Sequence, residues 1–343
     1  MESQHSKCIN LNNMVSKTKL AFAVIIAHCA ACAPQNKTLH KNLSYTVHFV
    51  TVEKNVKLEV LDWGGRGKSI VLLAGGGNTA HVFDDFAPIL ANNFHVYGIT
   101  RRGFGASQFA SIDNKDRLAK DILAVLDSMK ISNPILAGHS IAGTELTSIC
   151  FISQNRVSGL VYLEAGYPYA FRNGKSPGMN EFFDVKGPQQ PSPEEKDLTS
   201  FKSLQAWYTE TYGFQLPEAE FRQMWDSTLS GRVVRRRDSP GSGIFSVMFN
   251  NSERNDNIPL PSLAIFAIPH NKEAWMIKNS DVRMRNEATA YFSKIDSLTM
   301  RQAKAFEDGV PSARVLKLKG MHYIFISNET EVINAIRQFS KGL

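Results

Sequence analysis

The chain has 343 residues, of which 43% are hydrophobic and 21% are charged, a composition typical of a globular protein. This length excludes the class of small disulfide-stapled proteins, because the chain can bury a sizeable core without cross-links. The formal charge is +7, but basic residues are scattered, and the tight cluster is Arg232 with Arg235, Arg236 and Arg237. We interpret this cluster as a solvated face and expect no nucleic-acid partner.

The N-terminal segment has the order of features found in a secretory signal. Lys17 and Lys19 precede the apolar run 20–27, and the small-residue stretch 29–33 follows this run. The apolar run is shorter than the roughly 20 residues that a membrane span needs. We therefore expect residues 1–33 to be a signal that directs export.

Two processing routes fit this signal, and Met14 is an alternative start of the chain. Cleavage after Ala31 or Ala33 would release a soluble, secreted protein. The stretch around Cys32 instead resembles a degraded bacterial lipobox, and we favour lipidation of Cys32, which predicts a periplasmic or membrane-anchored lipoprotein with a polar tether at 34–42. Three of the four cysteines lie in this segment, so we expect neither a disulfide framework nor a cysteine metal site.

Eight segments have the character of β-strands, and helical segments alternate with them. Residues 45–52 and 56–63 alternate between apolar and polar side chains, as in a hairpin. The further strands are expected at 69–74, 94–100, 135–137, 157–163, 262–268 and 314–318. This alternation predicts a mainly parallel α/β sheet, in which ligands bind at the carboxyl ends of the strands.

The alternation breaks after Gly166. Residues 167–257 are rich in proline, glycine, aromatic and charged residues, which indicates a helical insertion rather than part of the sheet. The capping box at 192–195 predicts a helix over about 193–212, and Pro217 opens a second helix. The core then comprises residues 43–166 and 258–343.

The strand at 135–137 leads into Gly-His-Ser-Ile-Ala-Gly, residues 138–143, which precede a helical segment. Strand, tight turn and helix form the context in which such a motif becomes a nucleophile elbow, with Ser140 as the nucleophile. The strained turn tolerates no large side chain two positions before or after the serine, and Gly138 and Ala142 occupy those positions. The alternative is a glycine-rich turn in which Ser140 merely starts a helix.

A serine hydroxyl needs a base to take its proton, and the base needs a carboxylate to orient it. His322 follows the last strand, where a loop can fold back over the sheet, and is the preferred base, with His270 as its main rival. The acid is placed at the end of a strand, at Glu164 or, as the alternative, at Glu273. We favour Glu164, because its nearly apolar surroundings make an unpaired carboxylate costly.

The oxyanion of a tetrahedral intermediate needs two backbone donors. We expect one donor at Ile141, directly after the serine, and the other at Gly76 or Gly77 in the loop after the strand 69–74. Asn78 and His139 are candidate substrate contacts, although the side chain of His139 should point away from the reaction centre. The glycine loop lacks the spacing of a nucleotide-binding loop, and we expect no metal and no cofactor.

Taken together, the glycine loop, the turn at 102–107, the elbow at 138–143 and the Gly-Met-His at 320–322 resemble those of the α/β-hydrolase superfamily over about residues 45–340. The order nucleophile, acid, histidine is also that of the superfamily. Two departures stand out. Ala74 replaces a histidine that many members carry, and an acid at Glu164 is less common than one after the following strand.

This resemblance implies an α/β-hydrolase fold, with a mostly parallel eight-stranded sheet flanked by helices and a helical cap that roofs the site. Tyr167 and Trp207 are among the aromatic residues that would line such a cap. The expected activity is cleavage of a carboxylic ester in a small molecule through an acyl-enzyme. The alternatives are an amidase or aminopeptidase using the same residues, or a non-catalytic binding module on this scaffold. The oligomeric state is left open.

Overall fold

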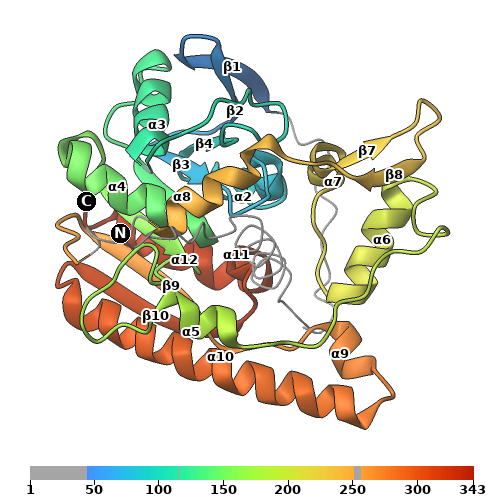
Figure 1. The fold of residues 1–343 in the computed structure, drawn as a ribbon. Helices are drawn as coiled ribbons and strands as arrows, with labels where there is room; N and C mark the ends of the chain where they lie inside the picture. The colour runs from blue at the N-terminus through green and yellow to red at the C-terminus, as the bar shows by residue number, and fades with distance from the viewer. Residues whose placement is uncertain (1–44, 115, 251–255) are drawn as a thin grey trace, which may run out of the picture.

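The computed structural model describes residues 45–114, 116–250 and 256–343, and an eight-stranded sheet runs through its centre (Figure 1). The strands are β1 (Thr46–Glu53), β2 (Val56–Gly64), β3 (Ser69–Leu73), β4 (His95–Ile99), β5 (Ile135–His139), β6 (Gly159–Leu163), β9 (Ser262–His270) and β10 (Ala313–Gly320). Their spatial order is β1-β2-β4-β3-β5-β6-β9-β10. The pairs β1–β2 and β2–β4 are antiparallel and the rest are parallel, which confirms the predicted mostly parallel sheet.

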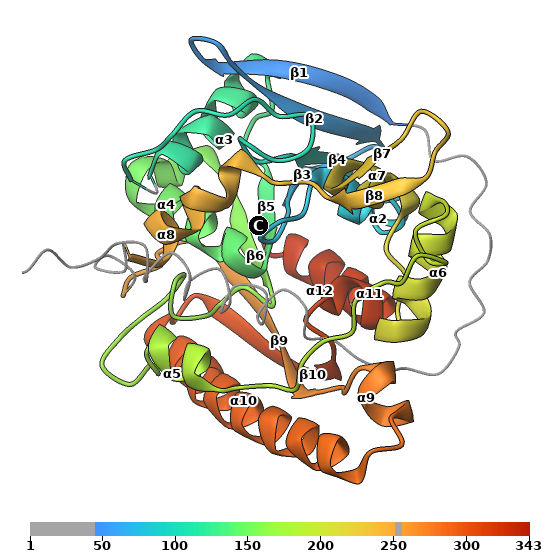
Figure 2. The ribbon, with the colours of Figure 1, turned by 45° about the vertical axis from the view of Figure 1, so that its right-hand side comes forward.

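Helices cover both faces of this sheet (Figure 2). One face packs against α3 (Asp116–Ser128), α4 (Gly143–Ser153) and α10 (Val282–Gly309). The other packs against α2 (Ala87–Leu90), α11 (Ile324–Ser327) and α12 (Glu329–Ser340). Because successive side chains of a strand point to opposite faces, a parallel strand between two helical layers must be apolar throughout. The buried run of β3 satisfies this requirement and leads to the loop that contains the glycines.

The insertion at 167–257 contains more than helices. Its helices are α5 (Met179–Asp184), α6 (Phe201–Tyr212), α7 (Glu218–Met224) and α8 (Ile244–Asn250), and η4 (Pro240–Gly243) is a 3-10 turn. Between α7 and η4 a two-stranded antiparallel sheet forms from β7 (Trp225–Ser227) and β8 (Val233–Arg236), which was not predicted from the sequence. Figure 1 shows α6, α7 and this hairpin on the same side of the molecule.

The predicted helix over 193–212 begins later than expected. The structure starts α6 at Phe201, because the side chain of Ser200 accepts a hydrogen bond from the N–H of Ser203 at 3.0 Å and caps the helix there. The capping-box pattern at 192–195 therefore does not start a helix in the structure. Pro217 does precede α7 directly, as expected.

The remaining elements are short turns and one helix that lie between the larger units. They are η1 (Ala80–Phe83), η2 (Ser140–Ala142), η3 (Gln154–Arg156) and α9 (Ala274–Lys278). Two of them matter for the site. The turn η1 follows the glycine loop directly, and η2 begins at Ser140 itself.

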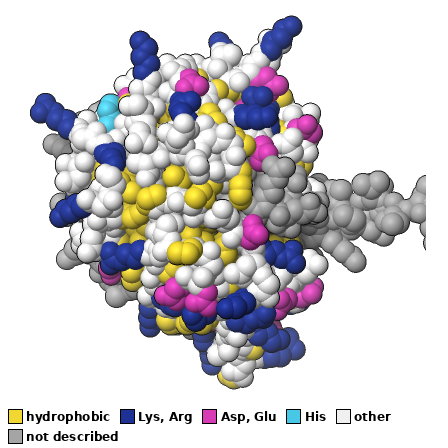
Figure 3. Space-filling model, turned by 90° about the vertical axis from the view of Figure 1, so that its left-hand side faces the viewer, with side chains coloured by type: hydrophobic (Ala, Val, Ile, Leu, Met, Phe, Trp, Pro, Cys, Tyr) yellow, Lys and Arg dark blue, Asp and Glu magenta, His cyan; other side chains and the backbone are white. Residues whose placement is uncertain are grey.

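The expected signal at 1–33 and tether at 34–42 lie outside the described residues. Across the part of the chain that the structure describes, no helix has both the length and the apolar character of a membrane span. The arginine cluster lies on and beside β8, where Arg232 pairs with Glu195, and Arg235 and Arg237 pair with Asp226. Figure 3 shows a different face, on which basic side chains stand apart and acidic ones lie among them.

Candidate active site

Ser140 lies at the junction of β5 and α4. Its φ is 53°, in the left-handed region that non-glycine residues rarely adopt. Small neighbours make this turn sterically possible. A Cβ atom on Gly143 would lie 2.0 Å from the carbonyl oxygen of Ala165, and one on Gly138 would lie 3.1 Å from the Cβ of Ala142. Strand, strained serine and helix together form the local geometry of a nucleophile elbow.

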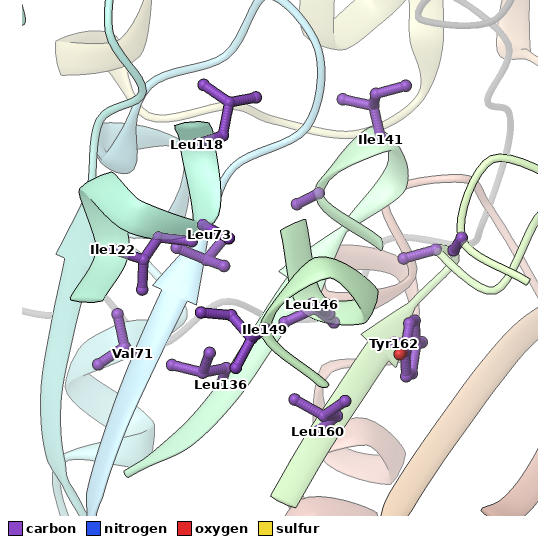
Figure 4. Close-up of a cluster of buried hydrophobic side chains, with 14 of the residues drawn as sticks. Val71, Leu73, Leu118, Ile122, Leu136, Ile141, Leu146, Ile149, Leu160 and Tyr162 are labelled. Atoms are coloured by element: carbon purple, nitrogen blue, oxygen red, sulfur yellow. The ribbon is translucent and has the colours of Figure 1, made fainter. Parts of the chain in front are cut away.

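The elbow is held in place by the packing of α4 on the sheet (Figure 4). Leu146 and Ile149 of α4 pack in the same buried cluster as Leu136 of β5 and Leu160 of β6. Close-packed side chains of this kind allow little movement of the helix relative to the strands. The start of α4, and with it Ser140, is therefore fixed relative to the carboxyl end of β5.

His322 reaches Ser140 from the loop after β10. Its Nε2 lies 2.9 Å from the serine Oγ. His139, next to the serine, supports this loop, because its Nε2 donates a hydrogen bond to the backbone oxygen of His322 at 2.9 Å. Burial and the neighbouring His322 lower the pKa of His139 well below its ordinary value, so this second imidazole stays neutral. The structure thus places His139 under the histidine loop rather than in a substrate space.

Glu164 stands at the end of β6, and its side chain is fully buried. Its Oε2 lies 3.1 Å from Nδ1 of His322 and accepts a hydrogen bond from the hydroxyl of Tyr167 at 2.8 Å. Its Oε1 accepts a hydrogen bond from the N–H of Ala267 at 2.6 Å. Burial raises the pKa of Glu164, but His270 and His322 outweigh burial and lower this pKa to about 2. The carboxylate is therefore ionised at neutral pH.

His270, which the sequence suggested as a rival base, lies beside the carboxylate instead. Its Nε2 is 3.5 Å from Oε2 of Glu164, and its Nδ1 is 2.6 Å from Oδ1 of Asp296 on α10. Burial lowers the pKa of His270, but the hydrogen bonds and charges of Asp296 and Glu164 raise it to about 9. His270 is consequently a cation at neutral pH. Its place at the end of a strand was visible in the sequence, whereas its partner Asp296 gave no signal.

Glu273, the alternative acid, takes a different place. It is fully buried and accepts a hydrogen bond from Nε1 of Trp275. Its charge raises the pKa of Tyr212, after the larger effect of burial. The Nδ1 of His322 is meanwhile bonded to Glu164. The structure thus brings Glu164, and not Glu273, to the histidine.

The glycine loop lies directly against Ser140. A Cβ atom on Gly75 would be 3.2 Å from the Cβ of Ser140 and 2.7 Å from Nδ1 of His139. The N–H of Asn78 closes a turn on the carbonyl of Gly75, and Gly77 has a φ of 78°, as the third residue of a type II turn requires. Gly75 therefore lies beside Ser140, and Gly76 and Gly77 follow it in the same turn.

The side chain of Asn78 is bonded to the protein at both ends. Its Nδ2 donates to Oε1 of Glu220 on α7 at 2.9 Å, and its Oδ1 accepts from the hydroxyl of Tyr323 at 3.0 Å. Glu220 also accepts a hydrogen bond from the N–H of Thr79 at 3.0 Å. In the structure Asn78 joins the glycine loop to the insertion and to the histidine loop, instead of pointing freely toward a substrate.

The aromatic residues that were expected to line the cap contact different parts of the molecule. Tyr167 contacts Glu164, and Trp207 on α6 packs edge to face against Tyr212. Tyr169 is another of the aromatic residues expected to line the cap, and the side chain of Ser140 interacts with its hydroxyl and lowers its pKa, against the larger effect of burial. Burial raises the pKa of Tyr169 well above its ordinary value, so this phenol keeps its proton next to the serine.

A family of known proteins matches this chain, and its fold agrees with the geometry described above. A profile of the Alpha/beta hydrolase family matches residues 70–323, well over half of the chain, and the chain belongs to this family. The AB hydrolase superfamily protein YisY of Bacillus subtilis (strain 168) is 29% identical over 157 residues. That match covers 41% of this chain and 57% of the relative, so the chain matches less than two thirds of YisY.

Solved structures share the fold at low sequence identity. The crystal structure of E-2-(acetamidomethylene)succinate hydrolase has a TM-score of 0.57 at 14% identity, covering 87% of this chain and all of that one. An esterase from Exiguobacterium antarcticum has a TM-score of 0.56 at 17% identity, covering 85% of this chain and 98% of that one. At these identities the likeness establishes the α/β-hydrolase fold.

Proposed function

We propose that the protein is a serine hydrolase that cleaves carboxylic esters through an acyl-enzyme intermediate. The observation that carries this proposal is the continuous chain of contacts from Ser140 to His322 at 2.9 Å and from His322 to Glu164 at 3.1 Å. The three residues come from the ends of three strands and have the nucleophile, base and acid roles of a catalytic triad.

The chemistry follows from these contacts. His322 takes the proton of Ser140 through Nε2 while the serine oxygen attacks the carbonyl carbon, and Glu164 stabilises the resulting imidazolium. The N–H groups of Ile141 and of Gly76 or Gly77 would bind the oxyanion. Collapse of the intermediate transfers the proton from His322 to the leaving alcohol. A water molecule then repeats the same steps on the acyl-enzyme and releases the acid.

The site is nearly closed to solvent, with Ser140 4% and His322 7% exposed. Water exclusion strengthens the electrostatic contacts that stabilise the transition state. A site in which Ser140 and His322 are this enclosed favours a small acyl substrate over a polymer. An esterase among the structural neighbours supports an ester as the substrate, and membership in the hydrolase family supports hydrolysis in general.

The proposal is tested with p-nitrophenyl acetate and p-nitrophenyl butyrate, with p-nitroanilides of the same acids as the amide arm. We expect ester turnover with an initial burst of p-nitrophenol equal to the enzyme concentration, which reports the acyl-enzyme. Ser140→Ala should abolish the burst. Faster cleavage of the anilides would indicate the amidase alternative. Equal background rates for the wild type and Ser140→Ala would indicate a binding module and overturn the proposal.

A further inference from the structure

The guanidinium of Arg101 joins the glycine loop to the helix that follows the nucleophile. Its Nη2 donates to the carbonyl of Ala74 at 2.8 Å and its Nη1 to the carbonyl of Gly75 at 3.3 Å. On its other side, Nε and Nη2 donate to the two carboxylate oxygens of Glu145 at 2.8 and 2.7 Å. Glu145 lies in the first turn of α4, and both side chains are buried.

These contacts act on the peptide unit that carries a candidate oxyanion donor. The carbonyl of Gly75 and the N–H of Gly76 belong to one planar, trans peptide, in which the C=O and the N–H point in opposite directions. A donor that fixes the carbonyl therefore also fixes the direction of the N–H. The positive charge beside the oxygen further polarises the peptide and strengthens its N–H as a donor.

The position of the second expected donor, the N–H of Ile141, is determined by a different part of the chain. It lies at the start of η2, which leads directly into α4. The two donors of an oxyanion hole must stay in register, since a displacement of about 1 Å in a catalytic geometry can cost about 100-fold in rate. Arg101 contacts both segments, through the glycine loop on one side and through Glu145 on the other.

We propose that Arg101 is the positioning residue of the oxyanion hole, held by Glu145, and that it sets the N–H of Gly76 relative to the N–H of Ile141. This inference rests on the proposed serine-hydrolase function. Stability alone is a weaker explanation of the pair, because apolar side chains of similar volume often stabilise a core as well as a buried ion pair does. Lysine cannot replace the planar fork, since it offers one charged nitrogen to the four acceptors.

The neighbouring Arg102 provides a matched control. Its side chain is fully buried, and it pairs with Asp121 on α3 through Nε at 2.6 Å and Nη2 at 2.7 Å. Its backbone contact is the carbonyl of Ala110, which is not part of the glycine loop. Arg101 and Arg102 are therefore adjacent, buried and ion-paired to a helix, but Arg101 alone of the two contacts the carbonyls of Ala74 and Gly75.

The experiment compares Arg101→Lys with Arg102→Lys in the full chain, using p-nitrophenyl butyrate and the inhibitor butylboronic acid. The boron accepts an electron pair from the oxygen of Ser140, whose proton passes to His322, and the tetrahedral adduct places an oxygen in the oxyanion hole. We expect Arg101→Lys to lower kcat by about 10- to 100-fold with little change in KM, and to raise the boronate Ki by the factor lost in kcat/KM. Arg102→Lys should lower the melting temperature while keeping kcat within about twofold.

The inference is overturned if Arg101→Lys keeps the wild-type kcat and Ki, or if Arg102→Lys loses activity to the same extent. Either result leaves the serine-hydrolase proposal intact, because that proposal depends on wild-type turnover and on its loss in Ser140→Ala. If Arg101→Lys does not fold, Glu145→Gln takes its place. A fall in kcat matched by a rise in Ki supports the inference, and unchanged values for both overturn it.

Discussion

Nε2 of His270 lies 3.5 Å from Oε2 of Glu164, the same carboxylate oxygen that pairs with Nδ1 of His322. One buried carboxylate thus has two imidazole neighbours. The imidazole of His270 is itself bonded to Asp296, with its Nδ1 2.6 Å from Oδ1. Because Asp296 and Glu164 raise the pKa of His270 to about 9 against the effect of burial, it supplies a fixed positive charge. This charge helps to keep Glu164 ionised in an environment that would otherwise protonate it.

Replacing His270 by glutamine should weaken catalysis by raising the pKa of Glu164. Without the cation, burial raises the pKa of Glu164, and a protonated acid stabilises the imidazolium of His322 less well. We expect kcat to fall by about tenfold and the acid limb of the kcat/KM profile to move to higher pH. A pH series with p-nitrophenyl butyrate measures both effects.

His95→Gln is the control for this change, since His95 is bonded to Asp62 at 2.9 Å at the amino end of β4, on a partly exposed surface. The control should leave the pH profile in place. An unmoved acid limb in His270→Gln would show that Glu164 does not depend on His270 for its charge.

The identity of the acid is tested by the pair Glu164→Gln and Glu273→Gln. Glutamine at 164 keeps the shape but removes the charge that stabilises the imidazolium, so kcat should fall by about 10²- to 10⁴-fold. Glutamine at 273 disturbs a buried carboxylate bonded to Trp275 and should lower the melting temperature without a comparable loss of kcat. The reverse pattern would move the acid to Glu273.

The hydroxyl of Tyr169 next to Ser140 should contribute directly to the reaction. Tyr169→Phe removes a hydroxyl that interacts with the side chain of Ser140, and we expect kcat to fall by about 3- to 10-fold. Tyr167→Phe removes a donor from Glu164 instead, so it should shift the acid limb of the pH profile, which Tyr169→Phe should leave in place. Steady-state kinetics of both variants distinguish the two tyrosines. If both variants keep the kcat and the pH profile of the wild type, neither hydroxyl has a specific role.

Much of the fold could be predicted because its signals are local. The ends of all eight central strands agree with the predicted ranges to within two residues. Apolar runs must become buried strands in a parallel sheet, and the small residues around Ser140 are required by the turn itself. Local signals failed in the insertion, where tertiary packing decides between competing helix starts. Ser200 caps α6, and the better pattern at 192–195 does not start a helix.

The site was predictable where the order of the strands brings residues together and unpredictable where no motif marks a contact. Glu164 and His322 follow strands, so their convergence could be inferred from topology. The bond from Arg101 to Glu145 and that from His270 to Asp296 join residues of different elements without any motif. Asn78 was expected to touch the substrate because of its position in the glycine loop. Its side chain is instead bonded to Glu220 of the insertion.

Glu220 attaches the insertion to the glycine loop, and we expect this attachment to depend on pH. Its fully buried carboxyl accepts hydrogen bonds from Asn78 and Thr79. Burial raises its pKa to about 7, against the hydrogen bonds from Thr79 and Asn78 and the charge of His81, which lower it. Because this pKa lies above the ordinary value of 4.5, the folded chain keeps a proton that the unfolded chain has released. The stability of the fold should therefore decrease as the pH rises from about 4.5 to about 7.

Glu220→Gln removes this dependence, because the amide stays neutral at every pH. We expect the variant to melt about 2–4 °C above the wild type at about pH 8, where the wild type buries a carboxylate, and to match it at about pH 5. Glu218→Gln is the control, since Glu218 lies on the same helix and is paired with Arg222 at the surface. Its melting curve should follow the wild type across the series. If Glu220→Gln also follows the wild type at each pH, the carboxyl of Glu220 does not titrate in this range, and the glycine loop is attached to α7 independently of pH.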